Sequence, residues 1–305
     1  MITLLGPTAS GKTRLAAVVA DKVDGEIISA DSRQVYRGMD IGTGKDLGDY
    51  LVSGKKIPVH LVDIADPREE YNIYLYQKDF RKAYMDITGR GKMPVLCGGS
   101  GMYLESVLKG YNLPETIHDE GWQKSLSAKS DKELAEELMK LKKLHGTSDI
   151  ENRSRIIKAL EIEFSRNANS VRQSFSPIPS TIFGLKLERE LQKKKITERL
   201  RERLRQGMVD EVSRLIKEGI PLQRLKSFGL EYRYVTEYLS GEKTYNEMFD
   251  ALNIAIHQFS KRQMTWFRRM ERNGTVIHWL DASDSLSRNA EKIIRMMAES
   301  SLMLY

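Results

Sequence analysis

A single motif near the start of the chain constrains its fold more than any other feature. The sequence reads G-x-x-x-x-G-K-T from Gly6 to Thr13, directly after the apolar pair Leu4-Leu5 and before the apolar helical stretch 15–20. A glycine-rich loop between a strand and a helix directs successive backbone N–H groups, and the positive end of the helix dipole, toward an anion. The pattern therefore predicts a parallel α/β sheet whose first loop binds a diphosphate or triphosphate, and it leaves open which one.

The residue types in this loop suit phosphate binding. Gly6 and Gly11 permit the backbone to curl, Lys12 supplies a mobile positive charge, and the hydroxyl of Thr13 is a ligand for Mg²⁺. The predicted diphosphate-binding residues are Gly6, Pro7, Thr8, Ala9, Ser10, Gly11, Lys12 and Thr13.

Two further junctions between a strand and a loop follow. Residues 25–30 predict a second strand that ends at Asp31, and residues 93–97 predict another that leads through Gly98-Gly99-Ser100-Gly101 into a helix. Ligands bind at the carboxyl ends of the strands in open parallel sheets, so we expect Asp31 and Ser100 to lie beside the phosphate loop. Further strands are predicted at 59–62, 181–187 and 276–280, and a helix at 74–88.

The composition bounds the class of protein. The 305 residues are 40% hydrophobic and carry a net charge of +7, which suits one large domain with an insertion and leans weakly toward a polyanionic partner. The one cysteine, Cys97, excludes an internal disulfide, follows an apolar run, and is predicted to be a buried strand residue. No apolar run approaches membrane length, so a cytoplasmic protein without membrane contact is expected.

The middle of the chain changes character. Residues 115–176 are polar, with two amphipathic helical patterns, and predict a helical insertion in a core made of 1–114 and 177–305. One long basic helix is predicted over 186–217 and another over 245–269. The latter ends in Lys261–Arg269, where basic and aromatic residues interleave as suits an RNA backbone and stacked bases.

These residues together indicate the transfer of a group from a phosphorylated donor to a second, anionic substrate. A phosphate loop, a carboxylate at the next strand end and a hydroxyl in a glycine turn are expected at one edge of the sheet. The pattern alone does not separate phosphoryl transfer from a reaction in which diphosphate is the leaving group.

The chain resembles the tRNA dimethylallyltransferase family in blocks that follow the family order from residue 4 to residue 281. The blocks are 6–13, 28–43, 60–63, 98–103, 152–161 and 261–268. The resemblance implies an α/β fold with a P-loop kinase-like parallel sheet flanked by helices and an all-helical insertion domain that grips the anticodon stem-loop of tRNA. It implies transfer of a dimethylallyl group from dimethylallyl diphosphate to N6 of the adenine 3′ of the anticodon, with Mg²⁺ as cofactor and a monomeric enzyme.

The resemblance also implies roles for particular residues. Asp31 matches the general base or amine-orienting carboxylate, Lys12 and Arg199 match groups that stabilise the departing diphosphate, and Ser100 stands where the family usually has threonine. The positions that match tRNA-contacting segments are Asp31, Ser32, Arg33, Gln34, Ser100, Asp119, Ser154, Arg155, Ile156, Ile157 and Lys158.

Three blocks depart from the family pattern. Val59-His60 stands where paired histidines are usual. Gly44-Lys45-Asp46 stands where A-K-P is usual, and Phe228-Gly229-Leu230 stands in place of I-G-Y. Three alternatives stay open: an adenylate dimethylallyltransferase that uses free AMP, a small-molecule kinase that uses ATP, and an ATP-dependent RNA-binding module. The insertion and the basic residues of 261–269 favour tRNA as the acceptor, and the carboxylate of Asp31 argues against a module without transfer chemistry.

Overall fold

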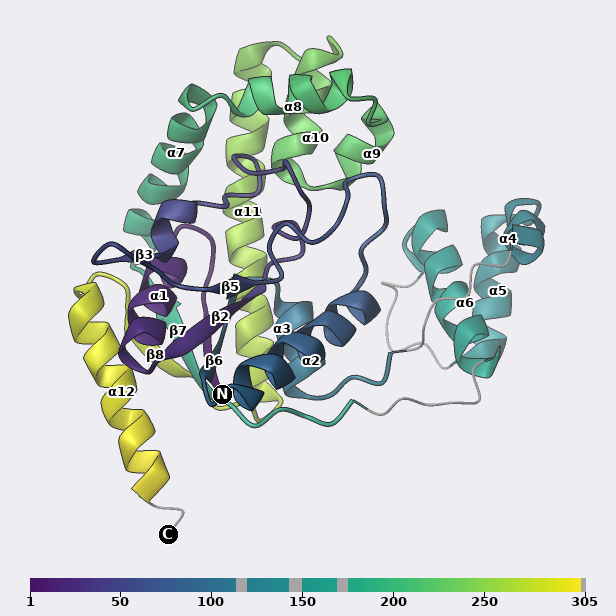
Figure 1. Cartoon of the computed structure of the whole chain (residues 1–305). Helices are drawn as coiled ribbons and strands as arrows, with labels where there is room; N and C mark the ends of the chain where they lie inside the picture. The colour runs from purple at the N-terminus through teal and green to yellow at the C-terminus, as the bar shows by residue number, and fades with distance from the viewer. Residues whose placement is uncertain (114–119, 143–149, 169–174, 303–305) are drawn as a thin grey trace. The chain divides into compact units, whose positions relative to one another are not determined.

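The computed structural model describes residues 1–113, 120–142, 150–168 and 175–302 (Figure 1). The chain divides into two compact units. Unit 1 comprises Met1–Lys109 and Pro177–Tyr305, and unit 2 comprises Gly110–Ser176.

Unit 1 is built on a six-stranded sheet with the order β5-β2-β6-β1-β7-β8, in which all paired strands are parallel. The predicted α/β class with a parallel sheet flanked by helices is thereby confirmed. The strands are β1 (Ile2–Leu5), β2 (Gly25–Ala30), β5 (Val59–His60), β6 (Met93–Gly98), β7 (Thr181–Lys186) and β8 (His278–Asp281). The strand predicted at 59–62 ends early because Leu61 and Asp63 adopt left-handed backbone conformations, with φ of 63° and 56°.

The register of the central strands brings three loops to one place. Leu5, the last residue of β1, and Ala30, the last residue of β2, both pair with Gly98 at the end of β6. The phosphate loop, Asp31 and the glycine turn therefore leave the sheet at the same level. This is the edge at which the sequence predicted them.

Helices cover both faces of the sheet (Figure 1). On one face, α1 (Lys12–Lys22) and α12 (Leu286–Leu302) contribute Leu15, Val19 and Ile293 to the core over the strands. Against the sheet also pack α2 (Ile73–Gly89) and, beside it, α3 (Gly101–Leu108), which in turn contacts the long helix α11 (Tyr245–Arg272). Thr244 and Glu247 form a capping box that fixes the start of α11.

A second core lies beyond the sheet, among α7 (Arg189–Arg205), α8 (Met208–Lys217), α9 (Leu222–Ser227), α10 (Leu230–Leu239) and the first half of α11. The prediction of one helix over 186–217 is wrong, because the chain breaks it at Gly207. That glycine has φ of 99°, which ends α7 and begins α8. The apolar spacing continues from Leu204 to Met208, and it therefore hid the break.

Smaller elements connect β2 to β5. They are the short helix η1 (Leu47–Tyr50) and the hairpin strands β3 (Leu51–Val52) and β4 (Lys55–Lys56), none of which the sequence analysis predicted.

Unit 2 consists, in its described part, of α4 (Glu120–Ser127), α5 (Asp131–Leu141) and α6 (Arg153–Ala168). The two predicted amphipathic helices correspond to α5 and α6, whereas α4 was not predicted. Leu134, Leu138 and Leu160 are fully buried in its core, and the rings of Trp122 and Phe164 stack with centroids 4.4 Å apart. Apolar packing among three short helices thus holds this unit together.

Candidate active site

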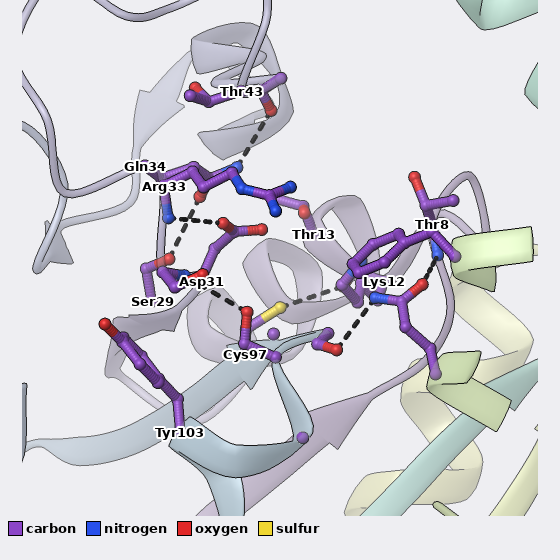
Figure 2. Close-up of a pocket in the computed structure, with 18 of the residues that line it drawn as sticks. Thr8, Lys12, Thr13, Ser29, Asp31, Arg33, Gln34, Thr43, Cys97 and Tyr103 are labelled. Atoms are coloured by element: carbon purple, nitrogen blue, oxygen red, sulfur yellow. Dashed lines mark hydrogen bonds between the residues drawn. The ribbon is translucent and has the colours of Figure 1, made fainter. Parts of the chain in front are cut away.

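The three loops at the edge of the sheet enclose a cavity of about 330 Å³ (Figure 2). Nine of the residues singled out from the sequence line it: Thr8, Lys12, Thr13, Asp31, Ser32, Arg33, Gln34, Ser100 and Arg199. The structure therefore brings together the loop after β1, the carboxylate after β2 and the hydroxyl after β6. Arg199 reaches the same cavity from α7.

The phosphate loop has the conformation that its sequence predicts. Gly11 adopts φ of 81° immediately before α1, so the N-terminus of the helix opens toward the loop. Pro7 has no N–H, and Thr8 donates its N–H to Gln263 Oε1 at 2.9 Å. The loop amides that remain for a phosphate are accordingly those from Ala9 onward.

Positive charge gathers where this loop meets α7. Withdrawal of the Lys12 ammonium from solvent lowers its pKa, and the guanidinium groups of Arg199 and Arg203 lower it further, against the opposing effects of Cys97 and Asp31. Burial likewise lowers the pKa of Arg203 to about 10, helped by Arg199. Buried cations that repel one another are stabilised when an anion binds between them.

Asp31, which Figure 2 shows beside Arg33, and Ser100 both accept hydrogen bonds from the backbone of segment 32–33. Asp31 Oδ1 accepts a hydrogen bond from the N–H of Arg33 at 3.0 Å, and Ser100 Oγ accepts one from the N–H of Ser32 at 3.3 Å. The N–H of Ser100 donates in turn to Ala30 O at 3.3 Å. These bonds hold the carboxylate and the hydroxyl against one wall of the cavity while the hydroxyl proton of Ser100 remains available.

A buried carboxylate fixes the loop that closes the cavity. Glu211 on α8 accepts hydrogen bonds from the backbone N–H groups of Asp40, Ile41 and Gly42 at 2.8, 2.8 and 3.0 Å. The hydroxyl of Tyr232 donates to the same carboxylate at 2.6 Å. Three successive amides around one carboxylate form an anion nest, here occupied by the protein's own side chain.

The departure at Gly44-Lys45-Asp46 has a structural role. Lys45 is 6% exposed, and its ammonium pairs with Asp40 at 3.0 Å and also with Asp63. Gly44 has φ of 70°, and a Cβ there would lie 1.7 Å from Nη2 of Arg203. A Cβ at this position would displace the guanidinium of Arg203 or the loop itself, and the positive φ also favours glycine.

A second, smaller pocket of about 240 Å³ lies on the outer side of the phosphate loop. It shares Lys12, Thr13 and Arg199 with the main cavity and adds the carboxylates of Asp46 and Asp49. Burial and the nearby Asp46 raise the pKa of Asp49. A hydroxyl and two carboxylates beside an anion-binding loop are oxygen donors of the kind that Mg²⁺ takes together with phosphate oxygens and water. The residues therefore fit the cation that the sequence implies, although the described residues contain no cluster of three or more histidine, cysteine or acidic side chains.

Several residues that line the cavity were not assigned a role from the sequence. Arg203 follows Arg199 by one helical turn on α7, and this spacing is the signal that would have revealed it. Gln263 lies in the block 261–268 and was given no role, whereas Trp266 was considered only as one of the aromatic residues that suit stacked bases. The remaining unassigned lining residues with polar or aromatic side chains are Ser29, Thr43, Tyr50, Tyr103, Glu231 and Phe259.

Cys97 is buried, as predicted, and burial raises the pKa of its thiol to about 11. The thiol donates weakly to Lys12 O at 3.8 Å. This group remains protonated near neutral pH, which agrees with the sequence-based view that it is no nucleophile.

The predicted tRNA contacts of the insertion lie in unit 2, within α6. Arg155 and Lys158 are exposed there, whereas Ile156 is 3% exposed and packs in the core of the unit. Ile157 packs against that core from a partly buried position. Ser154 lies near the start of α6, and Asp119 falls outside the described residues. Of the predicted contact residues in this helix whose side chains are described, Arg155 and Lys158 are the exposed ones.

The basic stretch at the end of α11 separates into two kinds of residue. Lys261, Arg262 and Arg268 are exposed, but Arg269 lies 3.9 Å above the ring of Trp266 and pairs with Glu105, which is 1% exposed. Arg269 is thus part of the structural framework. Of these four basic residues, Arg269 is the one that the framework of unit 1 holds through both an ion pair and a ring contact.

Comparison with known proteins agrees with this geometry. The family model described as IPP transferase matches residues 34–270, more than half of the chain. The chain belongs to the IPP transferase family. The tRNA dimethylallyltransferase 2 of Phocaeicola vulgatus is 52% identical over 298 residues, which cover 97% of each protein.

Solved structures of related proteins have the same fold. The tRNA isopentenylpyrophosphate transferase of Bacillus halodurans is 31% identical, and the match has a TM-score of 0.72 and covers 100% of this chain and 99% of that one. A eukaryotic dimethylallyltransferase described as acting on tRNA has a TM-score of 0.75 at 23% identity, over 93% of this chain and 74% of its own. In this IPP transferase family member, none of the described helices is both long and apolar enough to cross a membrane.

Proposed function

We propose that this protein is a tRNA prenyltransferase, which moves a dimethylallyl group from dimethylallyl diphosphate to N6 of the adenine 3′ of the anticodon. The observation that carries the proposal is the arrangement of the main cavity. Lys12, Arg199 and the loop amides lie on its donor side, and Asp31 and Ser100 lie on its acceptor side. The names of relatives about half identical to this chain support the transferred group and the tRNA acceptor.

The chemistry assigned to the residues is a substitution at the allylic carbon. The bond between C1 of the dimethylallyl group and the diphosphate oxygen breaks, and a bond between C1 and N6 of adenine forms. The proton lost from N6 passes to the carboxylate of Asp31, and the diphosphate leaves with the bonding electron pair. The amine is a weak nucleophile, so holding it in line with C1 supplies much of the rate enhancement.

The departing diphosphate is the charge that the donor side must stabilise. Its oxygens accept hydrogen bonds from the amides that begin at Ala9 and from the side chains of Lys12 and Arg199. Thr13, Asp46 and Asp49 would hold Mg²⁺, which would supply additional positive charge to the leaving group. The hydroxyl of Ser100, which already accepts the N–H of Ser32, is free to donate to the target nucleotide or to the diphosphate.

The tRNA is assigned to segment 31–34 at the cavity and to exposed residues of two helices. We place the anticodon stem-loop on the exposed residues of α6, on segment 31–34 and on the exposed cations of α11, with the target base flipped out of the stack into the cavity. A protein of this kind acts where tRNA is processed, in the cytoplasm.

Incubation with radiolabelled dimethylallyl diphosphate and Mg²⁺ tests the proposal. Parallel reactions contain unmodified tRNA, free AMP or no acceptor. We expect label in tRNA alone. Label in AMP alone would assign the protein to the adenylate branch, and the absence of labelled product from every reaction would contradict prenyl transfer altogether.

A further inference from the structure

We propose that Gln263 is a positioning residue, which clamps the phosphate-binding loop to the glycine turn that carries Ser100. The clamp fixes the separation between the donor and acceptor sides of the cavity. This inference rests on the proposed function, because it names the residue that sets the geometry of that reaction.

The side-chain amide of Gln263 bridges two backbone groups. It lies on α11, is 8% exposed, accepts the N–H of Thr8 through Oε1 at 2.9 Å and donates from Nε2 to Gly99 O at 2.9 Å. A backbone N–H can only donate and a backbone carbonyl can only accept, so the two partners determine which end of the amide faces which loop. Figure 2 shows the bond at Thr8 on one side of the cavity.

The two bridged residues belong to the loops that follow neighbouring strands. Thr8 lies three residues beyond the end of β1, and Gly99 follows directly after β6. A Cβ at Gly99 would lie 2.5 Å from Nε2 of Gln263 and 3.2 Å from Gly6 O. Glycine at 99 is therefore what lets the amide approach both loops at once.

A second side chain holds the other end of the Thr8 residue. Gln192 on α7 donates to Ser260 Oγ on α11 at 2.9 Å, and its Nε2 lies 3.5 Å from Thr8 O. The backbone N–H and carbonyl of Thr8 thus face amides from two different helices. The entry to the phosphate loop is consequently tied to the helical part of unit 1 as well as to the sheet.

These contacts assign Gln263 to positioning rather than to direct catalysis. Its amide oxygen and one N–H are already bonded to the backbone, and an unpaired group left by their loss would be costly in so buried a place. Without the clamp, the loop that holds the leaving group and the turn that holds Ser100 can move apart. A displacement of about 1 Å between reacting groups costs on the order of 10²-fold in rate.

Replacing Gln263 with methionine separates hydrogen bonding from packing. Gln263→Met keeps an unbranched side chain of similar size and removes both hydrogen bonds. Gln258→Met, the same change at an exposed position of α11, is the matched control. Gly99→Ala breaks the clamp from the other side, because its Cβ displaces Nε2 of Gln263.

Three measurements are made on each purified variant: kcat and KM with tRNA, the affinity for inorganic diphosphate with Mg²⁺ by calorimetry, and the midpoint of thermal unfolding. For Gln263→Met we expect kcat to fall by about 10- to 100-fold, with KM for tRNA within about twofold of wild type. Gly99→Ala is expected to lower kcat by a similar factor. The double variant should lower kcat by less than the product of the two single effects, because both changes break the same contact.

A wild-type kcat in folded Gln263→Met would overturn the clamp, and so would strict additivity of the two changes. If the wild-type protein were inactive, the proposed function would be wrong. The positioning role of Gln263 would then be tested by the affinity for inorganic diphosphate alone. We expect that affinity to fall by about tenfold in Gln263→Met, the equivalent of about 1.4 kcal/mol. An unchanged affinity in that case contradicts the clamp, and Gln258→Met should match wild type in every measurement.

Discussion

Arg199 Nη2 lies 2.6 Å from Asp46 Oδ2, so the cation assigned to the leaving diphosphate already has a carboxylate partner. Asp46 stands where the family usually has proline, and it lines the smaller pocket with Lys12 and Thr13. In this chain a bound diphosphate must therefore share Arg199 with Asp46 or displace it.

Asp46→Asn should raise the affinity for diphosphate measured without Mg²⁺. Both side chains of the pair are partly exposed, so the gain is limited to about 1 kcal/mol, or roughly fivefold. Calorimetric titration with inorganic diphosphate measures it. In an Arg199→Gln background the gain should vanish, and a gain of the same size there would show that the pair is not its source.

Asp31→Asn should lower kcat by about 10² to 10⁴-fold with little change in tRNA affinity. The substitution keeps an oxygen that can accept the N–H of Arg33, so it preserves the turn and removes only the charge and the basicity. Asp31→Ala removes the turn as well and provides the comparison. Near wild-type turnover in Asp31→Asn would eliminate the carboxylate from proton transfer.

Arg268 and Arg269 should differ in their effects, although they are adjacent in sequence. Arg268→Gln should reduce the slope of log affinity for tRNA against log salt by about 0.7 to 0.9, the value of one phosphate contact. Arg269→Gln should leave that slope unchanged and lower the free energy of unfolding by about 1 to 3 kcal/mol, because buried Glu105 then keeps only Lys109, at 3.3 Å. Filter binding across a salt series and urea unfolding test the two statements, and a swapped pattern would refute the division.

Glu26 on β2 should make stability depend on pH in the acidic range. Its hydrogen bonds with Arg90, and then with His60, lower the pKa of this buried carboxyl from 4.5 to about 2. The folded state thus favours the carboxylate, so the stabilisation is complete above pH 4.5 and is lost as the pH falls toward 2. The difference in unfolding free energy between wild type and Glu26→Gln should shrink across that interval. A difference that stays constant with pH would contradict the assignment.

The sequence predicted the elements whose signals are local. The spacing of glycine, lysine and threonine identifies the loop 6–13. The ends of β1, β2 and β6 are predicted where apolar runs give way to polar or glycine residues. The order of the strands then places Asp31 and Ser100 beside the loop, because parallel strands have their carboxyl ends at one edge.

Contacts between distant segments could not be predicted in this way. Glu211 lies about 170 positions from the amides that it holds, and Gln263 lies 255 positions from Thr8. A glutamate on an amphipathic helix and a glutamine in a basic stretch have the same local pattern whether they face solvent or a backbone amide. The break at Gly207 was missed for a related reason, since apolar periodicity records which face is buried and not where the helix axis turns.

Mass spectrometry of tRNA nucleosides tests the central claim most directly. An unmodified anticodon stem-loop is incubated with the protein, dimethylallyl diphosphate and Mg²⁺, then digested and analysed, beside a second stem-loop in which the adenine 3′ of the anticodon is replaced by guanine. The account predicts one adenosine that gains a C₅H₈ unit on N6 in the first RNA, and no such product in the second. The gain of that unit at another nucleoside, or the absence of any nucleoside that carries it, would contradict the account.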